Sequence, residues 1–192
     1  GFSCNLPGII KTYNKKKETG INIPIYGLCQ SRLMSFIDGD VLENIGNISI
    51  KLLKNCGKTL AAFDQSLLGF DHPAAHLGGA WELPRAGQHR EKLDSIDDPV
   101  LRKRVAWAFD RWEAVQVTLT GLPKQVIHGD ANKENILVKG DRVSGLVDFG
   151  DACFSPRICE LAICLAYLMM DRDDPMAAAR SVIAGYNGVI EL

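Results

Sequence analysis

Residues 126–151 read VIHGDANKENILVKGDRVSGLVDFGD, and this stretch decides the fold of the chain. Short apolar runs alternate in it with loops rich in Asp, Asn and Gly, which predicts a strand, a polar loop and two further strands joined by a turn. The first strand is expected at residues 125–128 and the next two at 136–138 and 146–147, with the turn at 140–141. This arrangement places the polar residues that end the strands along one side of a groove.

Asp130, Asn135 and Asp148 are the residues of this stretch suited to phosphoryl transfer. That reaction needs a carboxylate that takes the proton of the acceptor hydroxyl, and Gly129 lets the backbone turn tightly and bring Asp130 into a cleft. The Asn135 amide oxygen and the Asp148 carboxylate are hard ligands of the kind that Mg²⁺ prefers. His128 is grouped with Asp130 as catalytic, with the expected role of bracing the loop by packing and hydrogen bonding. Taken singly, Asp and Asn are common turn residues. The combination of all three at this spacing indicates a phosphoryl-transfer site much more specifically than any one of them does.

The composition is that of an ordinary globular protein, with 46% hydrophobic and 23% charged residues. With a net charge of −1, the chain lacks the excess of positive charge that is typical of proteins that bind nucleic acid or anionic lipid. No apolar run reaches the roughly 18 residues that a membrane span needs. The six cysteines lack metal-ligand spacing and are interpreted as reduced, mostly buried thiols. We therefore expect a cytoplasmic protein without nucleic-acid or membrane partners.

Apolar residues recur every three or four positions in two long segments, 48–68 and 97–119, and predict amphipathic helices. Gly57, in the middle of the first segment, costs about 1 kcal/mol relative to Ala, so close packing against a neighbour is expected there. The apolar stripe of the second helix is interpreted as core, and it consists of Leu101, Val105, Ala108, Trp112 and Val115.

The rest of the chain adds two more predicted helices, at residues 158–170 and 175–186. Residues 70–97 are expected to form a long connection with at most short helical turns, because Pro and Gly interrupt any regular pattern. Trp81 and Leu83 are expected to pin that connection to the core. Further upstream, an edge strand is predicted at 21–26 and a more buried strand at 32–37.

HGDANKEN at 128–135 together with DFGD at 148–151 resembles the aminoglycoside phosphotransferase and choline kinase group, which shares the protein-kinase-like fold. His-Gly-Asp in place of His-Arg-Asp, and the lack of an Ala-Pro-Glu motif after Asp148, favour a small-molecule substrate over a protein. The resemblance implies an α+β fold, the mainly helical large lobe of a kinase with short β-hairpins at the catalytic loops. Within the group, the hydroxylysine kinase branch is suggested by residues 57–73, 143–151, 160–170 and 182–186.

Transferred to matching positions, the resemblance implies that Asp130 is the catalytic base and that Asn135 and Asp148 hold Mg²⁺. RLMSFIDG at 32–39 looks like the strand and hinge that join the two kinase lobes. Backbone groups of the hinge would then meet the purine of ATP or GTP. The residues expected at the nucleotide on this basis are Ser35, Phe36, Ile37 and Val147.

Asp151 and Glu160 are the acidic residues that would face a cationic amino-alcohol substrate. The assignment of Glu160 is open, because this residue fits equally well as a favourable charge at a helix start or as a partner of Arg157.

No Gly-rich loop precedes the hinge, and Lys11 is a poor candidate for the strand lysine of a small lobe. We therefore interpret residues 1–37 as a remnant of the small lobe and hinge, and residues 38–192 as a large lobe truncated at both ends. On this interpretation the rest of the parent chain is an expected partner, and the fragment alone is inactive.

The favoured function is an ATP- or GTP-dependent phosphotransferase that moves the γ-phosphoryl group to a hydroxyl of a small molecule. The acceptor would be an amino alcohol such as hydroxylysine, or an aminoglycoside-like or choline-like compound. The alternative is a truncated, catalytically inactive kinase-like module that binds or regulates partners. A protein kinase is the third and poorest interpretation.

Overall fold

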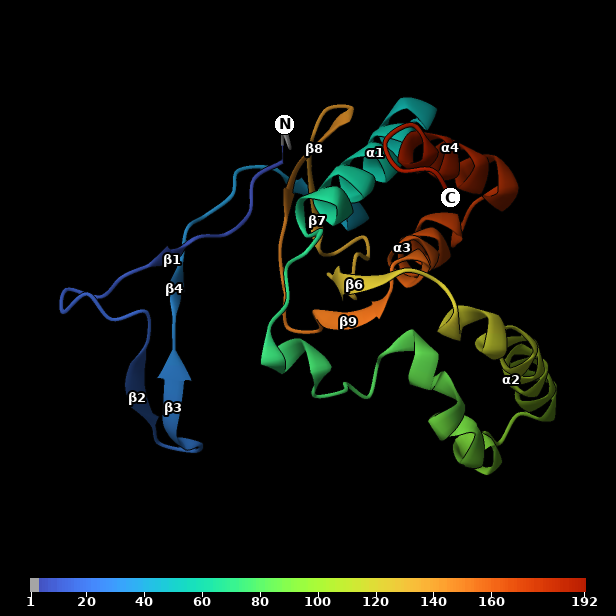
Figure 1. Ribbon diagram of the computed structural model, residues 1–192, viewed down its shortest axis with the longest axis horizontal. Coiled ribbons are helices and arrows are strands. Elements are labelled where there is room, and N and C mark those ends of the chain that lie inside the picture. The colour runs from blue at the N-terminus through green and yellow to red at the C-terminus, as the bar shows by residue number, and fades with distance from the viewer. Residues whose placement is uncertain (1–3) are drawn as a thin grey trace.

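The computed structural model describes residues 4–192 and has an α+β fold, in which a helical body is joined to a narrow N-terminal arm (Figure 1). The strands are β1 (Ile9–Ile10), β2 (Thr19–Ile23), β3 (Gly27–Ser31), β4 (Leu33–Met34), β5 (Asp40–Val41), β6 (Lys124–Ile127), β7 (Ile136–Lys139), β8 (Arg142–Leu146) and β9 (Cys153–Pro156). The helices are α1 (Ile50–Ser66), α2 (Pro99–Thr120), α3 (Ile158–Met169) and α4 (Pro175–Asn187), with 3₁₀ helices η1 (Leu42–Asn44), η2 (Pro73–His76) and η3 (Leu83–Ser95). The α-helices confirm the predicted segments to within two residues at each end.

Helices α1 and α4 pack closely against each other in the helical body, because glycines let their backbones approach closely. A Cβ atom at Gly57 would lie 1.9 Å from the carbonyl oxygen of Val182, and one at Gly185 would lie 2.0 Å from that of Lys54. Any larger side chain at either position would force the two helices apart. The predicted close packing at Gly57 is therefore confirmed.

The β7–β8 hairpin covers one side of α1 and carries residues of the predicted site at its open end. Ile136 pairs with Leu146, and beyond the strands the Val147 N–H donates to the Asn135 carbonyl oxygen at 3.0 Å. Asn135 and the residue after Val147 are therefore neighbours across the hairpin, as the sequence predicts. Gly140, at φ +56°, supplies the left-handed backbone of the expected turn.

Strand β6 leads into residues 128–135, which we call the catalytic loop after their predicted role, and pairs antiparallel with β9. Strand β9 was not among the predicted strands. Its last residue, Pro156, is compatible with a two-stranded sheet because proline is tolerated at sheet edges. Ile127, Cys153 and Cys159 form a small apolar cluster behind this pair.

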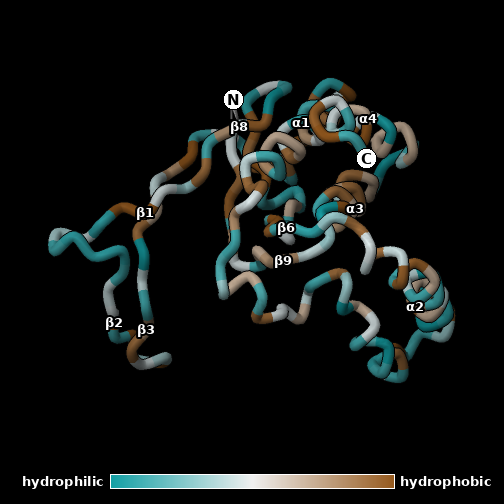
Figure 2. The backbone as a smooth tube through the Cα atoms, in the orientation of Figure 1, coloured by the Kyte–Doolittle hydropathy of each residue, from teal (hydrophilic) through white to brown (hydrophobic). Residues whose placement is uncertain are grey.

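The N-terminal arm consists of two antiparallel ribbons, β1 with β4 and β2 with β3 (Figure 1). The prediction of a buried strand at 32–37 is wrong, because Leu33 and Phe36 are 64% and 90% exposed and only Ile37 is buried. Two-stranded ribbons have no second layer to cover their faces. Figure 2 accordingly shows hydrophobic residues on the arm, away from the helical body.

Helix α2 lies at the periphery and packs mainly on η3. The interpretation of its stripe as core is wrong, since none of its residues is buried and Leu101 and Val115 are about half exposed. Trp112 contacts η3, where its indole N–H donates to the Leu83 carbonyl oxygen at 3.0 Å. One 3₁₀ helix covers too little surface to bury this face.

The connection between α1 and α2 contains more helix than predicted, because η3 alone spans 13 residues. Leu83 packs against the cluster of Ile127, Cys153 and Cys159, as expected. Trp81 is 78% exposed, so the prediction that it pins the connection to the core is wrong.

The six cysteines are free, and five of them are buried, in agreement with their interpretation as reduced thiols. Within residues 4–192, no helix is both long enough and apolar enough to cross a membrane.

Candidate active site

Two amide side chains hold the carboxylate of Asp130 in the catalytic loop. Its Oδ1 accepts a hydrogen bond from Asn132 Nδ2 at 2.9 Å, and its Oδ2 accepts one from Asn135 Nδ2 at 2.8 Å. Gly129, at φ +80°, precedes it, and a Cβ there would lie 2.4 Å from the Asp151 carbonyl oxygen. The expected need for glycine is confirmed, and the carboxylate has a defined orientation.

His128 is fully buried beneath the loop rather than exposed in a cavity. Its Nδ1 accepts from the Asp130 N–H at 3.3 Å, and its Nε2 lies 2.9 Å from the Val147 carbonyl oxygen, to which it donates. Burial lowers the pKa of His128, which favours this neutral tautomer. Its ring packs on Phe149 with centroids 4.6 Å apart. These contacts suit the predicted bracing role of His128.

Asn135 and Asp148 lie at the same end of the β7–β8 hairpin and offer oxygen atoms that suit a Mg²⁺ ion. Because Asn135 donates its Nδ2 protons to Asp130, its Oδ1 is the atom available to a cation. Asp148 is exposed, and its φ of +60° is a strained conformation that costs roughly 1–2 kcal/mol for a residue other than glycine. No group of three His, Cys, Asp or Glu side chains suited to a metal occurs in residues 4–192. Mg²⁺ typically takes one or two protein carboxylates and fills its other positions with phosphate and water, so this small donor set fits.

The predicted nucleotide residues meet in one cavity of about 510 Å³. The wall of this cavity also contains Asp148, together with apolar side chains that the sequence analysis did not identify, among them Met34, Leu137 and Phe149. Segments 100 or more residues apart in the sequence thus form one mainly apolar cavity, whose wall also contains a candidate metal ligand. The predicted residues in its wall are Ser35, Phe36, Ile37 and Val147.

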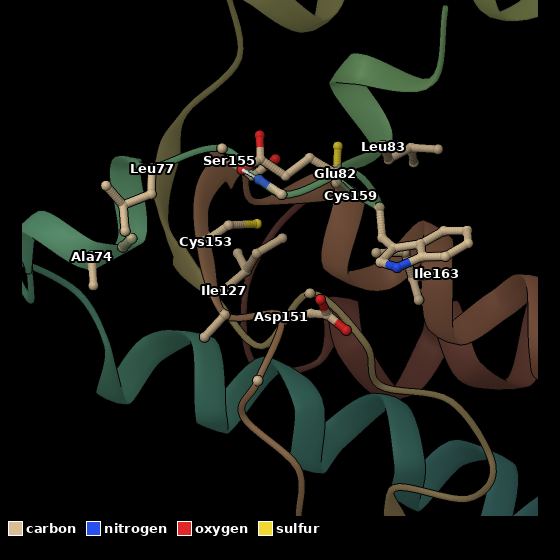
Figure 3. Close-up of a pocket in the computed structure, with 17 residues that line it drawn as sticks. Ala74, Leu77, Glu82, Leu83, Ile127, Asp151, Cys153, Ser155, Cys159 and Ile163 are labelled. Carbon is tan, nitrogen blue, oxygen red and sulfur yellow. Dashed lines mark hydrogen bonds between the residues drawn. The ribbon is translucent and has the colours of Figure 1, made fainter. Parts of the chain in front are cut away.

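Two further cavities share part of their walls, including Asp151. The first, of about 210 Å³, lies between the segment 74–83, β9 and α3 and contains the carboxylates of Glu82 and Asp151 (Figure 3). The second, of about 440 Å³, contains Asp130 and Tyr167. Trp81 and Asp151 line both. Asp151 therefore borders open space in both cavities, and its role as a substrate-facing residue stays a prediction.

The sequence analysis missed Trp81, Glu82 and Tyr167 as cavity residues. Glu82 is held by its own loop, since its Oε1 accepts from the Gly79 N–H at 2.8 Å. One feature of the sequence could have identified Glu82. It stands next to the aromatic Trp81 in a Gly- and Pro-rich connection, and binding residues often occur in such loops. That segment was interpreted only as a link between helices.

The prediction that Glu160 faces a substrate is wrong. Its side chain is fully buried at the start of α3, and Oε2 accepts the backbone N–H groups of His128 and Gly129. Burial raises the pKa of Glu160. The first turn of α3 points beneath the catalytic loop, so this carboxyl group supports the loop from inside.

The chain is similar in sequence to known proteins. The profile of the phosphotransferase enzyme family matches residues 12–189. The chain is 30% identical over 171 residues to hydroxylysine kinase of Danio rerio, a match that covers 84% of this chain and 48% of that protein. It is also 30% identical over 163 residues to homoserine kinase of Phenylobacterium zucineum (strain HLK1), with 82% and 48% covered. The chain thus spans about half the length of the curated relatives it matches.

Among solved structures, an amicoumacin kinase in complex with AMP-PNP, Ca²⁺ and Ami superposes with a TM-score of 0.70 at 14% sequence identity. The superposition covers 98% of this chain and 58% of that one. At this identity the likeness shows the fold, and it confirms the predicted α+β, protein-kinase-like large lobe. Since its profile covers residues 12–189, the chain belongs to the phosphotransferase enzyme family.

Proposed function

We propose that this protein is an ATP- or GTP-dependent phosphotransferase that moves the γ-phosphoryl group to a hydroxyl of a small molecule. The observation that carries the proposal is that Asp130 and Asp148 line two cavities that a third cavity connects. The third cavity shares Gly129 and Asp151 with the cavity of Asp130, and Gly150 with the cavity of Asp148. An acceptor and a nucleotide could therefore meet at the catalytic loop.

In this reaction Asp130 takes the proton of the acceptor hydroxyl while that oxygen forms its bond to the γ-phosphorus. The bond between the γ-phosphorus and the bridging oxygen breaks, and the nucleoside diphosphate leaves. The amide groups of Asn132 and Asn135 keep the Asp130 carboxylate aimed at the hydroxyl. Mg²⁺, when bound by Asn135 and Asp148, supplies positive charge for the phosphate oxygens. The cavity with Ser35, Phe36, Ile37 and Val147 is proposed for the nucleotide base.

We propose an amino alcohol such as hydroxylysine as the acceptor. The relatives named above act on hydroxylysine and homoserine, and both molecules carry a hydroxyl and an ammonium group. The charged residues in the walls of the two cavities beside Asp130 are Glu82, Asp130 and Asp151, and within the described chain no Lys or Arg lines them. Such a site attracts a cation, and Asp151 lies where it can receive the ammonium group.

We also propose a cytoplasmic location and the division into a small-lobe remnant and hinge at residues 1–37 and a large lobe at 38–192. The exposed apolar side chains of the arm support a further part of the small lobe as its partner. Residues 1–3 of the first segment lie outside the described residues.

The test measures phosphate transfer by the full-length protein with Mg²⁺ and labelled ATP or GTP. The acceptors are hydroxylysine, homoserine, choline and an aminoglycoside. Asp130→Asn should lower turnover at least about 100-fold, because it removes the base, while nucleotide affinity stays within a few-fold. Asp173→Asn, a change at an exposed aspartate after α3, is the matched control. Absence of transfer to any acceptor, with nucleotide still bound, would instead favour the inactive module.

A further inference from the structure

The cavity proposed for the nucleotide has a positively charged side chain in its wall. Within the described chain, the charged residues that line this cavity of about 510 Å³ are Arg32 and Asp148. A nucleoside triphosphate brings several negative charges next to the carboxylate of Asp148. Part of this charge is offset by Mg²⁺, and kinase-type sites use a cationic side chain for the phosphates as well. The reaction proposed above uses no such side chain, and Lys11 does not line the cavity.

Arg32 contributes to the cavity wall because of its place in the segment that leads to the hinge. Arg32 and Met34 line the cavity, whereas Leu33 between them does not, as the alternation of side chains along an extended chain requires. The Ser35 N–H donates to the Gly8 carbonyl oxygen at 2.8 Å and fixes the end of this segment. At roughly 3.3 Å per residue, Arg32 lies about 10 Å along the chain from Ser35. One wall therefore has room for a base at the hinge and for phosphates near Arg32.

The partner of Arg32 in the structure is one carboxylate oxygen. Its Nε and Nη2 donate to Glu18 Oε2 at 3.2 and 3.0 Å, and its Nη1 has no hydrogen-bond partner within the described chain. The side chains of Arg32 and Glu18 are 58% and 43% exposed, and ion pairs as exposed as this one contribute little to stability. A phosphate group presents several charged oxygens to the planar guanidinium and binds it through two parallel hydrogen bonds. Phosphate is therefore a better partner for Arg32 than the single oxygen of Glu18.

We propose that Arg32 binds the phosphate groups of the nucleotide and that these phosphates replace Glu18 as its partner. The guanidinium then adds a positive charge to a cavity whose other charged side chain, within the described residues, is the carboxylate of Asp148. This role rests on the proposed function, because that function assigns the cavity to the nucleotide. It does not depend on which acceptor is used or on the transfer step itself.

Binding of a nucleotide and of its nucleoside to the full-length protein tests this role. Both are measured with Mg²⁺ by displacement of a fluorescent nucleotide analogue, using ATP with adenosine or GTP with guanosine, whichever pair binds more tightly. Arg32→Gln should weaken triphosphate binding about 10-fold and nucleoside binding less than about twofold, because charge-assisted hydrogen bonds to phosphate are lost and the base contacts stay. Arg32→Lys keeps the charge without the planar fork and should lose about threefold.

The matched control is an arginine with a similar environment on another element. Arg180 of α4 is 67% exposed and forms an ion pair with Asp174 at 3.8 Å, and it does not line the nucleotide cavity. Arg180→Gln removes the same charge and should leave the affinity for triphosphate and nucleoside unchanged.

Glu18→Gln separates binding of phosphate from support of the arm. If Arg32 acted only by tying its segment to Glu18, loss of either side chain would break the same ion pair and impair binding equally. The proposed role predicts that Glu18→Gln binds triphosphate as tightly as the wild type or up to about threefold more tightly, because no ion pair is exchanged. Inorganic tripolyphosphate should displace the analogue from the wild type and do so about 10-fold less well from Arg32→Gln.

The proposal is overturned if Arg32→Gln lowers triphosphate and nucleoside affinity equally, or lowers neither. A Glu18→Gln variant as impaired as Arg32→Gln would overturn it as well. A wild type that binds the triphosphate through Arg32 but transfers no phosphate would refute the proposed function and leave this inference standing. A wild type without measurable affinity for ATP or GTP would overturn both.

Discussion

Helices α1 and α2 have similar sequence patterns and very different surroundings. Both begin with a capping side chain, Ser49 for α1 and Asp98 for α2, and both have apolar residues at helical spacing. Helix α1 is buried along one face against α4 and β8, whereas no residue of α2 is buried. An amphipathic pattern therefore identifies the face that a helix can bury, but the amount buried depends on the surface opposite.

The largest difference between the two helices should come from truncating apolar side chains. Leu60 in α1 is 2% exposed, and Leu101 in α2 is 49% exposed. Leu60→Ala should lower the free energy of unfolding by about 2–5 kcal/mol through lost burial and a cavity, and Leu101→Ala by under about 1 kcal/mol. Urea denaturation of the two variants measures both values. Equal losses would mean that α2 is buried in solution.

A smaller difference is expected from adding a methyl group to a glycine of each region. Gly57→Ala places a Cβ against the Val182 carbonyl oxygen and should cost about 1–3 kcal/mol. Gly121 at the end of α2 has its nearest contact at 3.7 Å from such a Cβ, with φ −88°. Gly121→Ala should therefore be neutral or stabilising by about 0.5 kcal/mol. Thermal unfolding compares the two, and a tolerated Gly57→Ala would show that α1 and α4 can separate without loss.

The smallest difference between the two helices is expected from removing the capping side chain at the start of each. Ser49 Oγ accepts from the Leu52 N–H at 3.0 Å, and Asp98 Oδ1 accepts from the Val100 N–H at 2.8 Å. Ser49→Ala and Asp98→Ala should each cost about 1 kcal/mol through the lost cap, because capping satisfies local backbone groups whatever the helix packs against. Ser49→Ala also removes the hydrogen bond that Ser49 Oγ donates to Asp141 Oδ1 at 2.6 Å, so its total cost should be the larger. Chemical denaturation of the two variants checks this, and a larger cost for Asp98→Ala would contradict it.

The geometry of residues 126–151 was predictable because it depends on spacing along a short segment. A hairpin of fixed register makes neighbours of Asn135 and Val147, so the positions of both proposed metal ligands follow from counting residues. Gly129 was identifiable for the same reason, since the backbone next to Asp151 has no room for a side chain. The nucleotide residues also came together as predicted, although their roles stay predictions.

The errors concern residues whose surroundings come from distant parts of the chain. Glu160 is acidic and close in sequence to Asp151, but α3 turns it beneath the loop, where it is buried and supports backbone N–H groups. Phe36 and Trp81 are large and apolar, yet both remain exposed because the ribbon and the connection have no second layer over them. Glu82 lines the same cavity as Asp151 because the connection between α1 and α2 passes along that cavity.

Local sequence was sufficient for the four α-helices, the β7–β8 hairpin and the order of Asp130, Asn135 and Asp148, because hydrogen-bonding periodicity and turn chemistry act over a few residues. Tertiary packing alone decided which apolar faces are covered and which acids face a cavity. It also buried Glu160 of α3 beneath the loop, against the N–H groups of His128 and Gly129. Burial and electrostatic interaction depend on what lies within a few ångströms in space, and no pattern along the chain records that.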